Sequence, residues 1–141
     1  MKLVIDTNVL ISGSLWRGAP AQLLDAALSG RARIFLSKTL LLELDEVLRR
    51  PKFTARLTAQ GETAAGIVAR LRDGSFEIAP ARILPPENFR DPDDLHILAC
   101  ALAAQADAVV SGDDDLRALG SFRGIPILDV PSALLWLGRG K

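Results

Sequence analysis

Short apolar runs alternate along the chain with longer stretches in which apolar residues recur every three to four positions. The runs are typical of buried strands and fall at 3–5, 34–36, 76–79, 108–110 and 125–128. The periodic stretches predict helices at 21–28, 37–50, 95–103, 114–119 and 132–137, with two short helices in the more polar segment 52–73. The first strand is predicted to lead into a loop at 6–8.

The alternation of strands and helices predicts an α/β domain, a three-layer α/β/α sandwich with a mainly parallel sheet of four to five strands. A chain of 141 residues with 49% hydrophobic residues suits a single domain over 1–141. In such sheets ligands bind beyond the carboxyl ends of the strands. Asp6 and Asp113 both follow predicted strands, so we expect both at that edge.

Composition narrows the classes of function. The 17 Lys and Arg residues balance 17 Asp and Glu residues, so any nucleic-acid binding must be local rather than a property of the whole charge. The single cysteine, Cys100, excludes an internal disulfide and a cysteine-rich zinc site, and we expect it in the core. No apolar stretch reaches the roughly 18 residues of a membrane span, and Asp6 interrupts the first apolar run too early for a signal peptide. We therefore expect a soluble, cytoplasmic protein.

The acidic residues are unevenly placed, and each group taken alone has an ordinary explanation. Asp6 can hydrogen-bond its own turn. The segment Asp91-Pro92-Asp93-Asp94 has the pattern of a helix cap followed by an acidic first turn. The three residues 113–115 can likewise begin a short helix. Glu43 interrupts a run of leucines, so its carboxylate needs a partner if it faces inward and none if it faces outward.

The convergence of these acids on one edge of the sheet favours a metal site. Carboxylates held close together repel one another unless they share a proton or a cation. Oxygen ligands suit Mg²⁺ or Mn²⁺ and disfavour zinc, and such ions promote phosphodiester hydrolysis. The sequence lacks a nucleophile elbow, a P-loop and a dinucleotide-binding glycine turn. We interpret His96 as a helix-surface residue rather than a base.

Four segments, in their order along the chain, resemble the PIN-domain family. They are Val4-Ile5-Asp6-Thr7-Asn8-Val9-Leu10, the stretch from Leu41-Leu42-Glu43-Leu44 to Arg50-Pro51-Lys52-Phe53, Arg90-Asp91-Pro92-Asp93-Asp94, and Val109-Val110-Ser111-Gly112-Asp113-Asp114-Asp115-Leu116. Within the family the chain is most similar to toxins of toxin–antitoxin systems, related to VapC-like ribonucleases that cut RNA with Mg²⁺ or Mn²⁺. The resemblance spans nearly the whole chain.

The resemblance implies an endoribonuclease with a defined set of site residues. Its catalytic acids are Asp6, Glu43, Asp94 and Asp113; its metal ligands are Asp6, Asp94, Asp113 and, as a further candidate, Asp115; Asn8 and Ser111 support them. Glu43 is expected to position a second ion or the attacking water. The fourth acid stays open between Asp113 and Asp115, of which we choose Asp113, and Asp91, Asp93 and Asp114 are better explained as caps.

The resemblance also implies partners. RNA is the expected substrate, and a small antitoxin is expected to fill the acidic groove with its C-terminal segment. Family members often form dimers or higher oligomers, for which the apolar residues around Leu15-Trp16 and Leu135-Trp136 are compatible with an interface, although core packing is the expected role of Trp136.

A basic patch formed by Arg49, Arg50, Lys52 and Arg56 either grips RNA phosphates or is a solvated surface. We predict little sequence readout from it because no aromatic side chains interleave with it. Loss of RNA affinity in an Arg49→Ala, Arg50→Ala double variant would support phosphate contacts by this patch, and unchanged affinity would exclude them.

Two other functions compete with the nuclease. A phosphomonoesterase of the haloacid dehalogenase type also begins with a strand ending in Asp, but it requires a second Asp two positions later, where this chain has Asn8. A degenerate PIN fold that binds a partner or RNA without catalysis is the second alternative. The presence of all four acids argues against it.

Overall fold

A computed structural model of the chain describes residues 1–86 and 94–139. Within them, six strands form one sheet in the order β3-β2-β1-β4-β6-β5. The strands are β1 (Lys2–Ile5), β2 (Arg33–Leu36), β3 (Phe76–Glu77), β4 (Ala108–Val110), β5 (Ser121–Phe122) and β6 (Ile125–Leu128). All neighbouring strands run parallel except β5 and β6, which form an antiparallel pair at one edge. The carboxyl ends of β1 and β4 therefore lie side by side.

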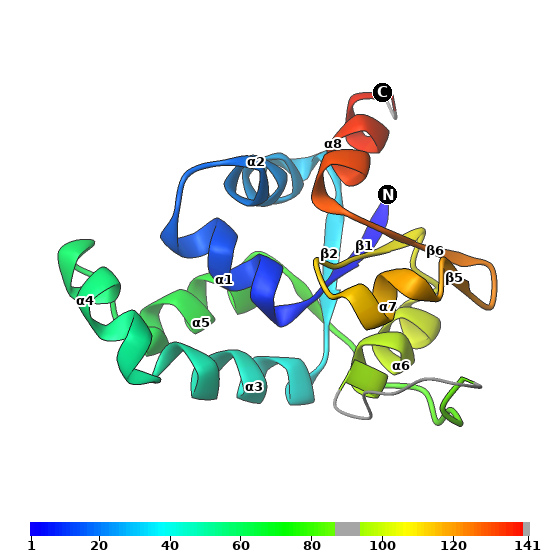
Figure 1. Ribbon diagram of the computed structural model, residues 1–141, viewed down its shortest axis with the longest axis horizontal. Helices are drawn as coiled ribbons and strands as arrows, with labels where there is room; N and C mark the ends of the chain where they lie inside the picture. Colours follow the sequence, from blue (N-terminus) through cyan, green and yellow to red (C-terminus); the bar gives the residue numbers. More distant parts are fainter. Residues whose placement is uncertain (87–93, 140–141) are drawn as a thin grey trace.

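Helices cover the sheet on both sides. They are α1 (Thr7–Leu15), α2 (Ala19–Ala26), which continues into the π-helical turn η1 (Ala27–Arg31), α3 (Lys38–Leu48), α4 (Pro51–Ala59), α5 (Ala64–Asp73), α6 (Leu95–Ala104), α7 (Asp114–Ala118) and α8 (Val130–Arg139). α6 contacts β1, β2 and β4, whereas α2 packs against α1 and α8. Figure 1 shows α1 and α2 on one side of β1 and β2, and α6 on the other. This arrangement confirms the predicted α/β/α fold.

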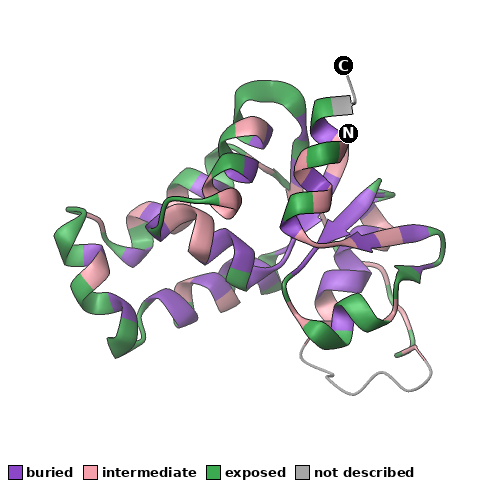
Figure 2. Cartoon of the chain, turned by 45° about the horizontal axis from the view of Figure 1, so that its top comes forward, coloured by how far each residue is buried: buried purple, intermediate pink, exposed green. Residues whose placement is uncertain are grey.

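The core lies along the central strands. In β1 and β4 every residue from Leu3 to Ile5 and from Ala108 to Val110 is buried, as expected for parallel strands covered on both faces. Cys100 is also buried, which confirms its predicted place in the core, and Trp136 packs against the core from α8. Figure 2 shows this buried centre and the largely exposed α4 at the far end of the molecule. No described helix has the length and apolar character needed to cross a bilayer.

Close packing fixes α1 against α2. A Cβ atom on Gly13 would lie 2.6 Å from Leu24 Cδ1 and 2.8 Å from the carbonyl oxygen of Pro20. Only glycine permits this approach, because interiors are packed too densely for the neighbours to give way. The contact sets the direction of α1, whose first residues lie at the carboxyl end of β1.

Two expectations about the elements were wrong. The predicted loop after the first strand is the helix α1, which begins at Thr7 because the Asp6 carboxylate accepts a hydrogen bond from the Val9 backbone N–H at 3.0 Å and so caps it. The sheet has six strands in the described residues rather than four to five, because the short β5 turns back on β6. All five predicted strands are present, and the two short helices expected in 52–73 are α4 and α5.

Candidate active site

Four carboxylates line one small cavity at the carboxyl edge of the sheet. The cavity has a volume of about 50 Å³ and is lined by Asp6, Thr7, Asn8, Glu43, Val47, Asp94, Ile97 and Asp113. The acids come from four elements: the end of β1, the middle of α3, the residue before α6 and the residue before α7. The structure thus brings together all four predicted catalytic acids, and it places Asn8 beside them.

Asp6 is the most deeply buried of these acids, with 5% of its surface exposed. Its backbone N–H donates to the Val110 carbonyl at 3.0 Å, which continues the pairing of β1 with β4. Its Oδ1 accepts from the Val9 N–H, and its Oδ2 accepts from the Ser111 hydroxyl. Burial raises the pKa of Asp6, and the nearby charge of Asp113 adds to this rise, although the hydrogen bonds oppose it. An ionised Asp6 would therefore be stabilised by a cation.

Ser111 connects Asp6 to Asp113. The fully buried Ser111 hydroxyl donates to Asp6 and accepts from the Asp113 backbone N–H at 2.9 Å. Asp113 in turn caps α7, because its Oδ1 accepts from the N–H groups of Asp115 at 2.7 Å and Leu116 at 3.1 Å. One hydroxyl thus fixes the ends of β1 and β4 relative to each other.

The other two acids of the triple Asp lie outside the cavity. Asp115 is exposed and contributes its backbone N–H, not its carboxylate, to the α7 cap. Asp114, which we predicted as a cap, is instead the first residue of α7, and its exposed carboxylate lies 3.9 Å from Arg117. The cap is Asp113, so the aspartate that lines the cavity is also the one that caps α7.

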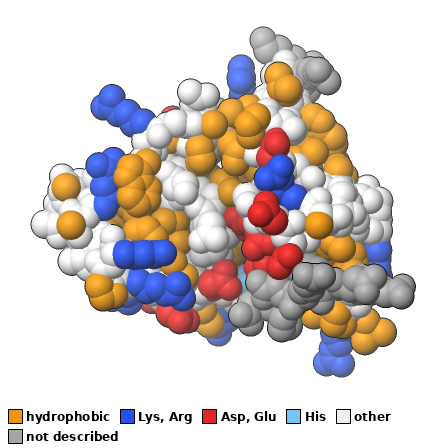
Figure 3. Space-filling model, viewed as in Figure 1, with side chains coloured by type: hydrophobic (Ala, Val, Ile, Leu, Met, Phe, Trp, Pro, Cys, Tyr) orange, Lys and Arg blue, Asp and Glu red, His pale blue; other side chains and the backbone are white. Residues whose placement is uncertain are grey.

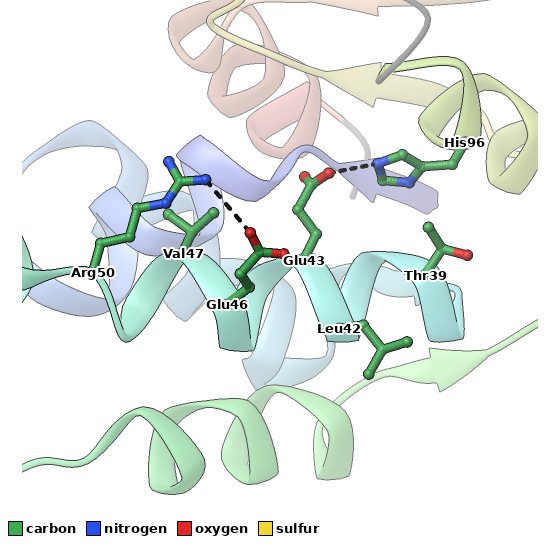
Figure 4. Close-up of a pocket in the computed structure, with 7 residues that line it drawn as sticks. All are labelled: Thr39, Leu42, Glu43, Glu46, Val47, Arg50 and His96. Carbon is green, nitrogen blue, oxygen red and sulfur yellow. Dashed lines mark hydrogen bonds and ion pairs between the residues drawn. The ribbon is translucent and has the colours of Figure 1, made fainter.

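Glu43 faces inward and has two side-chain partners. Thr7 Oγ1 donates to Glu43 Oε1. On the other oxygen, His96 Nε2 lies 3.0 Å from Glu43 Oε2 (Figure 4). The Glu43 side chain is 34% exposed, so it is reachable from solvent while both of its oxygens are held. These contacts satisfy the requirement that a carboxylate among leucines have a partner if it faces inward.

Thr7 and His96 are two residues of the site that the sequence interpretation missed. The sequence predicts His96 as a helix-surface residue, but its side chain is only 14% exposed because the start of α6 packs against α3. Thr7 was placed in a loop. Two signals point to them: His96 is the only histidine of the chain and lies two residues after Asp94, and Glu43 needed a partner.

A wider groove of about 500 Å³ adjoins the acid cavity along α3. It is lined by Thr39, Leu42, Glu43, Glu46, Val47, Arg50 and His96, and it shares Glu43 and Val47 with the cavity (Figure 4). Arg50 lies 4.0 Å from Glu46, and Arg49 lies 3.0 Å from Asp45, each across one turn. Two cations of the predicted RNA-binding patch therefore have acidic neighbours in the last turn of α3.

The chemistry of the donors fits a hard cation such as Mg²⁺ or Mn²⁺. In residues 1–86 and 94–139, no three His, Cys, Asp or Glu side chains converge closely enough to form a ready-made metal cage. Mg²⁺ rarely uses such a cage, since it commonly binds one or two carboxylates and completes its shell with water and phosphate oxygens. Asp6 and Asp113 interact closely enough for one charge to raise the pKa of the other carboxyl. A cation beside them would relieve that repulsion.

The third acidic segment is described only from Asp94 onward. Arg90, Asp91, Pro92 and Asp93 lie outside the described residues, so the predicted caps at Asp91 and Asp93 remain predictions. Asp94 is the described member of this segment, and it lines the cavity.

Comparison with known proteins gives one family and one fold. Residues 2–115 match a family model described as PIN domain. The structure is similar to a chain in the crystal structure of VapBC2 from Rickettsia felis bound to a DNA fragment from their promoter, with a TM-score of 0.59, 13% sequence identity, and coverage of 92% of this chain and 98% of that chain. At this identity the likeness concerns the fold. No curated protein matches the sequence.

Proposed function

The chain belongs to the PIN domain family, whose members are generally nucleases, and from this premise we propose that it is a Mg²⁺- or Mn²⁺-dependent endoribonuclease. The observation that carries the proposal is the single cavity lined by Asp6, Glu43, Asp94 and Asp113. These acids lie far apart in the sequence. Helix capping accounts for Asp6 and Asp113, but it explains neither Glu43 nor the meeting of the four acids at one edge of the sheet.

In this proposal Asp6, Asp94 and Asp113 hold the metal ion, and Ser111 keeps two of them in register. When bound, such an ion lowers the pKa of a coordinated water and neutralises charge that develops on the phosphodiester. Glu43 orients the attacking water or a second ion, and Thr7 and His96 hold its two oxygens in place. Asn8 lies at the rim of the cavity, where its amide can hydrogen-bond the substrate.

RNA is the proposed substrate because basic side chains lie on the same face as the acids. Figure 3 shows Lys and Arg side chains gathered on this face beside the acidic side chains, over the end of the molecule formed by α3 and α4. An acidic cavity flanked by cations suits a polyanion whose scissile phosphate approaches bound metal while the rest of its backbone contacts positive charge. Phosphate contacts by Arg49, Arg50 and Lys52 are part of this proposal.

We also propose that the protein is a cytoplasmic toxin that a small antitoxin neutralises, and that it forms a dimer or a higher oligomer. The similarity in fold to a chain of VapBC2 supports this cellular role. An antitoxin segment that placed an arginine among the four carboxylates would block the cavity through charge-assisted hydrogen bonds.

The proposal is tested by incubating the purified protein, freed of any partner, with labelled single-stranded RNA and Mg²⁺ or Mn²⁺. We expect cleavage by the wild type, and none with EDTA or with the Asp94→Asn variant. Asp114→Asn is the matched control, because this exposed acid lies outside the cavity and should leave cleavage unchanged. Cleavage that persists in EDTA would contradict the metal mechanism.

The competing functions give different results in the same assay. Membership of the PIN family removes the support for a phosphomonoesterase, which rested on a strand that ends in Asp. A non-catalytic binding module would bind RNA or a partner, would cut nothing, and would show no heat of Mn²⁺ binding in calorimetry. That pair of results would replace the nuclease with the binding module.

A further inference from the structure

An exposed tryptophan lies beside basic side chains where the end of α1 meets α4. Trp16, the residue after α1, is 44% exposed. Its ring meets the Phe53 ring edge to face, with 6.2 Å between centroids, and the Arg56 guanidinium lies 5.5 Å from the Trp16 ring. The Lys52 ammonium lies 5.0 Å from the Phe53 ring. We refer to these four residues, Trp16, Lys52, Phe53 and Arg56, as the tryptophan corner.

The tryptophan corner is held rigidly. The Leu15 carbonyl, at the end of α1, accepts from Arg56 Nε at 2.6 Å and from Gln60 Nε2 at 2.5 Å. Phe53 is buried, and its edge-to-face contact holds one side of the indole ring. An aromatic ring that is fixed before binding loses little conformational freedom when a flat ligand stacks on it.

The positive charges of the tryptophan corner are not neutralised by neighbouring acids. None of the ion pairs in the described part of the chain involves Lys52 or Arg56, whereas Arg49 and Arg50 each face an acid of α3. Arg56 uses its Nε–H on the Leu15 carbonyl, and its terminal N–H groups form the planar fork that matches a phosphate. This combination of an exposed ring with unneutralised cations complements single-stranded nucleic acid, which offers bases and phosphates together.

The tryptophan corner is also within reach of the acid cavity. α1 begins at Thr7, which lines the cavity, and ends at Leu15, directly before Trp16. Nine helical residues rise about 13 Å, so the two sites are separated by the length of a few nucleotides. α3, which carries Glu43, leads directly into α4, which carries the other three residues of the corner.

We propose that Trp16 stacks on a base of single-stranded RNA a few nucleotides from the scissile phosphate, while Arg56 and Lys52 contact the adjoining phosphates. This inference rests on the proposed function, since it takes RNA as the substrate. It also corrects the expectation that no aromatic side chain joins the basic patch, because Phe53 lies within the patch and α1 brings Trp16 to it from a distant part of the sequence. Stacking of this kind tolerates any base, so the corner adds affinity and positions the strand without selecting a sequence.

The first experiment measures binding of a labelled single-stranded RNA by fluorescence anisotropy, in an Asp94→Asn background that suppresses cleavage. We expect Trp16→Ala to weaken binding about tenfold or more, as loss of one base–aromatic stack typically does, and Trp16→Phe to retain most of the affinity. Phe76→Ala is the matched control, because Phe76 is a 52% exposed aromatic residue on the edge strand β3. Arg123→Ala, at an arginine that lies over Phe122 at the opposite edge of the sheet, is the control for Arg56→Ala.

A set of RNAs, each lacking the base at a different position, separates the contribution of stacking to affinity from the contribution of charge. Removal of the stacked base should weaken RNA binding by the protein that retains Trp16. It should not lower the RNA affinity of the Trp16→Ala variant any further. The chain has two tryptophans, so a Trp136→Phe variant leaves Trp16 as the single reporter, and its fluorescence should be quenched by RNA.

Three outcomes would overturn the inference. Equal RNA affinities of Trp16→Ala and Phe76→Ala would show that Trp16 does not stack on a base. A Trp16→Ala variant that changes the oligomeric mass in solution and leaves RNA affinity unchanged would make the corner an interface between copies of the chain. Lack of RNA binding by every form, with cleavage absent as well, would refute the proposed function together with the inference; binding without cleavage would refute the nuclease alone.

Discussion

Asp6 and Asp113 lie at the ends of β1 and β4, and each carboxylate accepts a hydrogen bond from the backbone N–H groups that begin the following helix. Glu43 lies across the same cavity, but it stands in the middle of α3, and its two partners are the side chains of Thr7 and His96. We call these the strand side and the helix side of the cavity. On the strand side, backbone N–H groups of the fold hold the carboxylates. On the helix side, other side chains hold the Glu43 carboxylate.

This difference separates effects on stability from effects on the proposed catalysis. A substitution on the strand side that removes the acceptor oxygen uncaps a helix, so it changes the folding free energy as well as the site. A substitution on the helix side removes a contact from Glu43 and leaves strands and caps intact. The two sides should therefore respond differently when activity and stability are measured on the same variants.

The largest effect is expected for Asp6→Asn. RNA cleavage should fall more than about 100-fold, because loss of a second-shell partner already costs up to that much and Asp6 is proposed as a direct ligand. Stability in EDTA should change little, since the amide still caps α1 and the relief from burying a charge offsets the loss of the hydrogen bond that the Ser111 hydroxyl donates to Oδ2. Mn²⁺ should raise the melting temperature of the wild type but not of the variant. A variant that Mn²⁺ stabilises as much as the wild type would remove Asp6 from the metal site.

His96→Ala should give the next largest effect, on the helix side. We expect kcat to fall about 10- to 100-fold, as for other second-shell partners, with KM and the melting temperature close to those of the wild type. His96→Gln, which keeps a donor toward Glu43, should recover part of the rate. If kcat is unchanged while the melting temperature falls, His96 is a packing residue and the contrast between the two sides fails.

Asp113 and Asp115 provide a smaller but sharper test on the strand side. Asp113→Ala should destabilise the protein by about 1 kcal/mol through loss of the α7 cap and should also abolish cleavage. Asp113→Asn keeps the cap and should lose cleavage alone. Asp115→Ala is the matched control, since its carboxylate is exposed and lies outside the cavity. Urea unfolding and RNA cleavage measured on all three variants would decide which aspartate is the fourth acid.

The smallest expected effect is a pH dependence of stability without metal. Because the pKa of Asp6 is raised in the folded protein, the native state binds the proton more tightly than the unfolded state does, and stability falls as pH rises through the interval between the two pKa values. Relative to Asp6→Asn, the wild type should lose stability across that interval. Asp129, whose pKa is lowered by its hydrogen bonds to Ser132, should give the opposite slope. Parallel curves for the wild type and Asp6→Asn would show that Asp6 has no such shift.

The sequence predicted the parts of the fold that local signals mark. The helix α3 begins after Ser37, whose hydroxyl caps it, and the buried strands are continuous apolar runs. α1 was missed because its buried residues include the consecutive run Val9 to Ile11, so its apolar positions show no clear helical period. The four acids were predicted because their order along the chain resembles a family, not because any single motif required a site.

The parts of the site that were not predicted all depend on contacts between distant segments. The bonds from Thr7 and His96 to Glu43 join residues separated by 36 and 53 positions. The pairing of Trp16 with Phe53 likewise joins the end of α1 to α4. No local pattern encodes such contacts, because they follow from the packing of α1, α3 and α6 around the carboxyl edge of the sheet.

The cap that Asp6 supplies to α1 also limits how this protein can change over evolutionary time. Most replacements of Asp6 would uncap the helix and leave the Val9 N–H without its acceptor. Asparagine caps a helix as well as aspartate does, so a single-step change to asparagine would remove a proposed metal ligand and preserve the fold. A lineage that keeps this fold solely to bind its partners is therefore expected to carry asparagine at position 6.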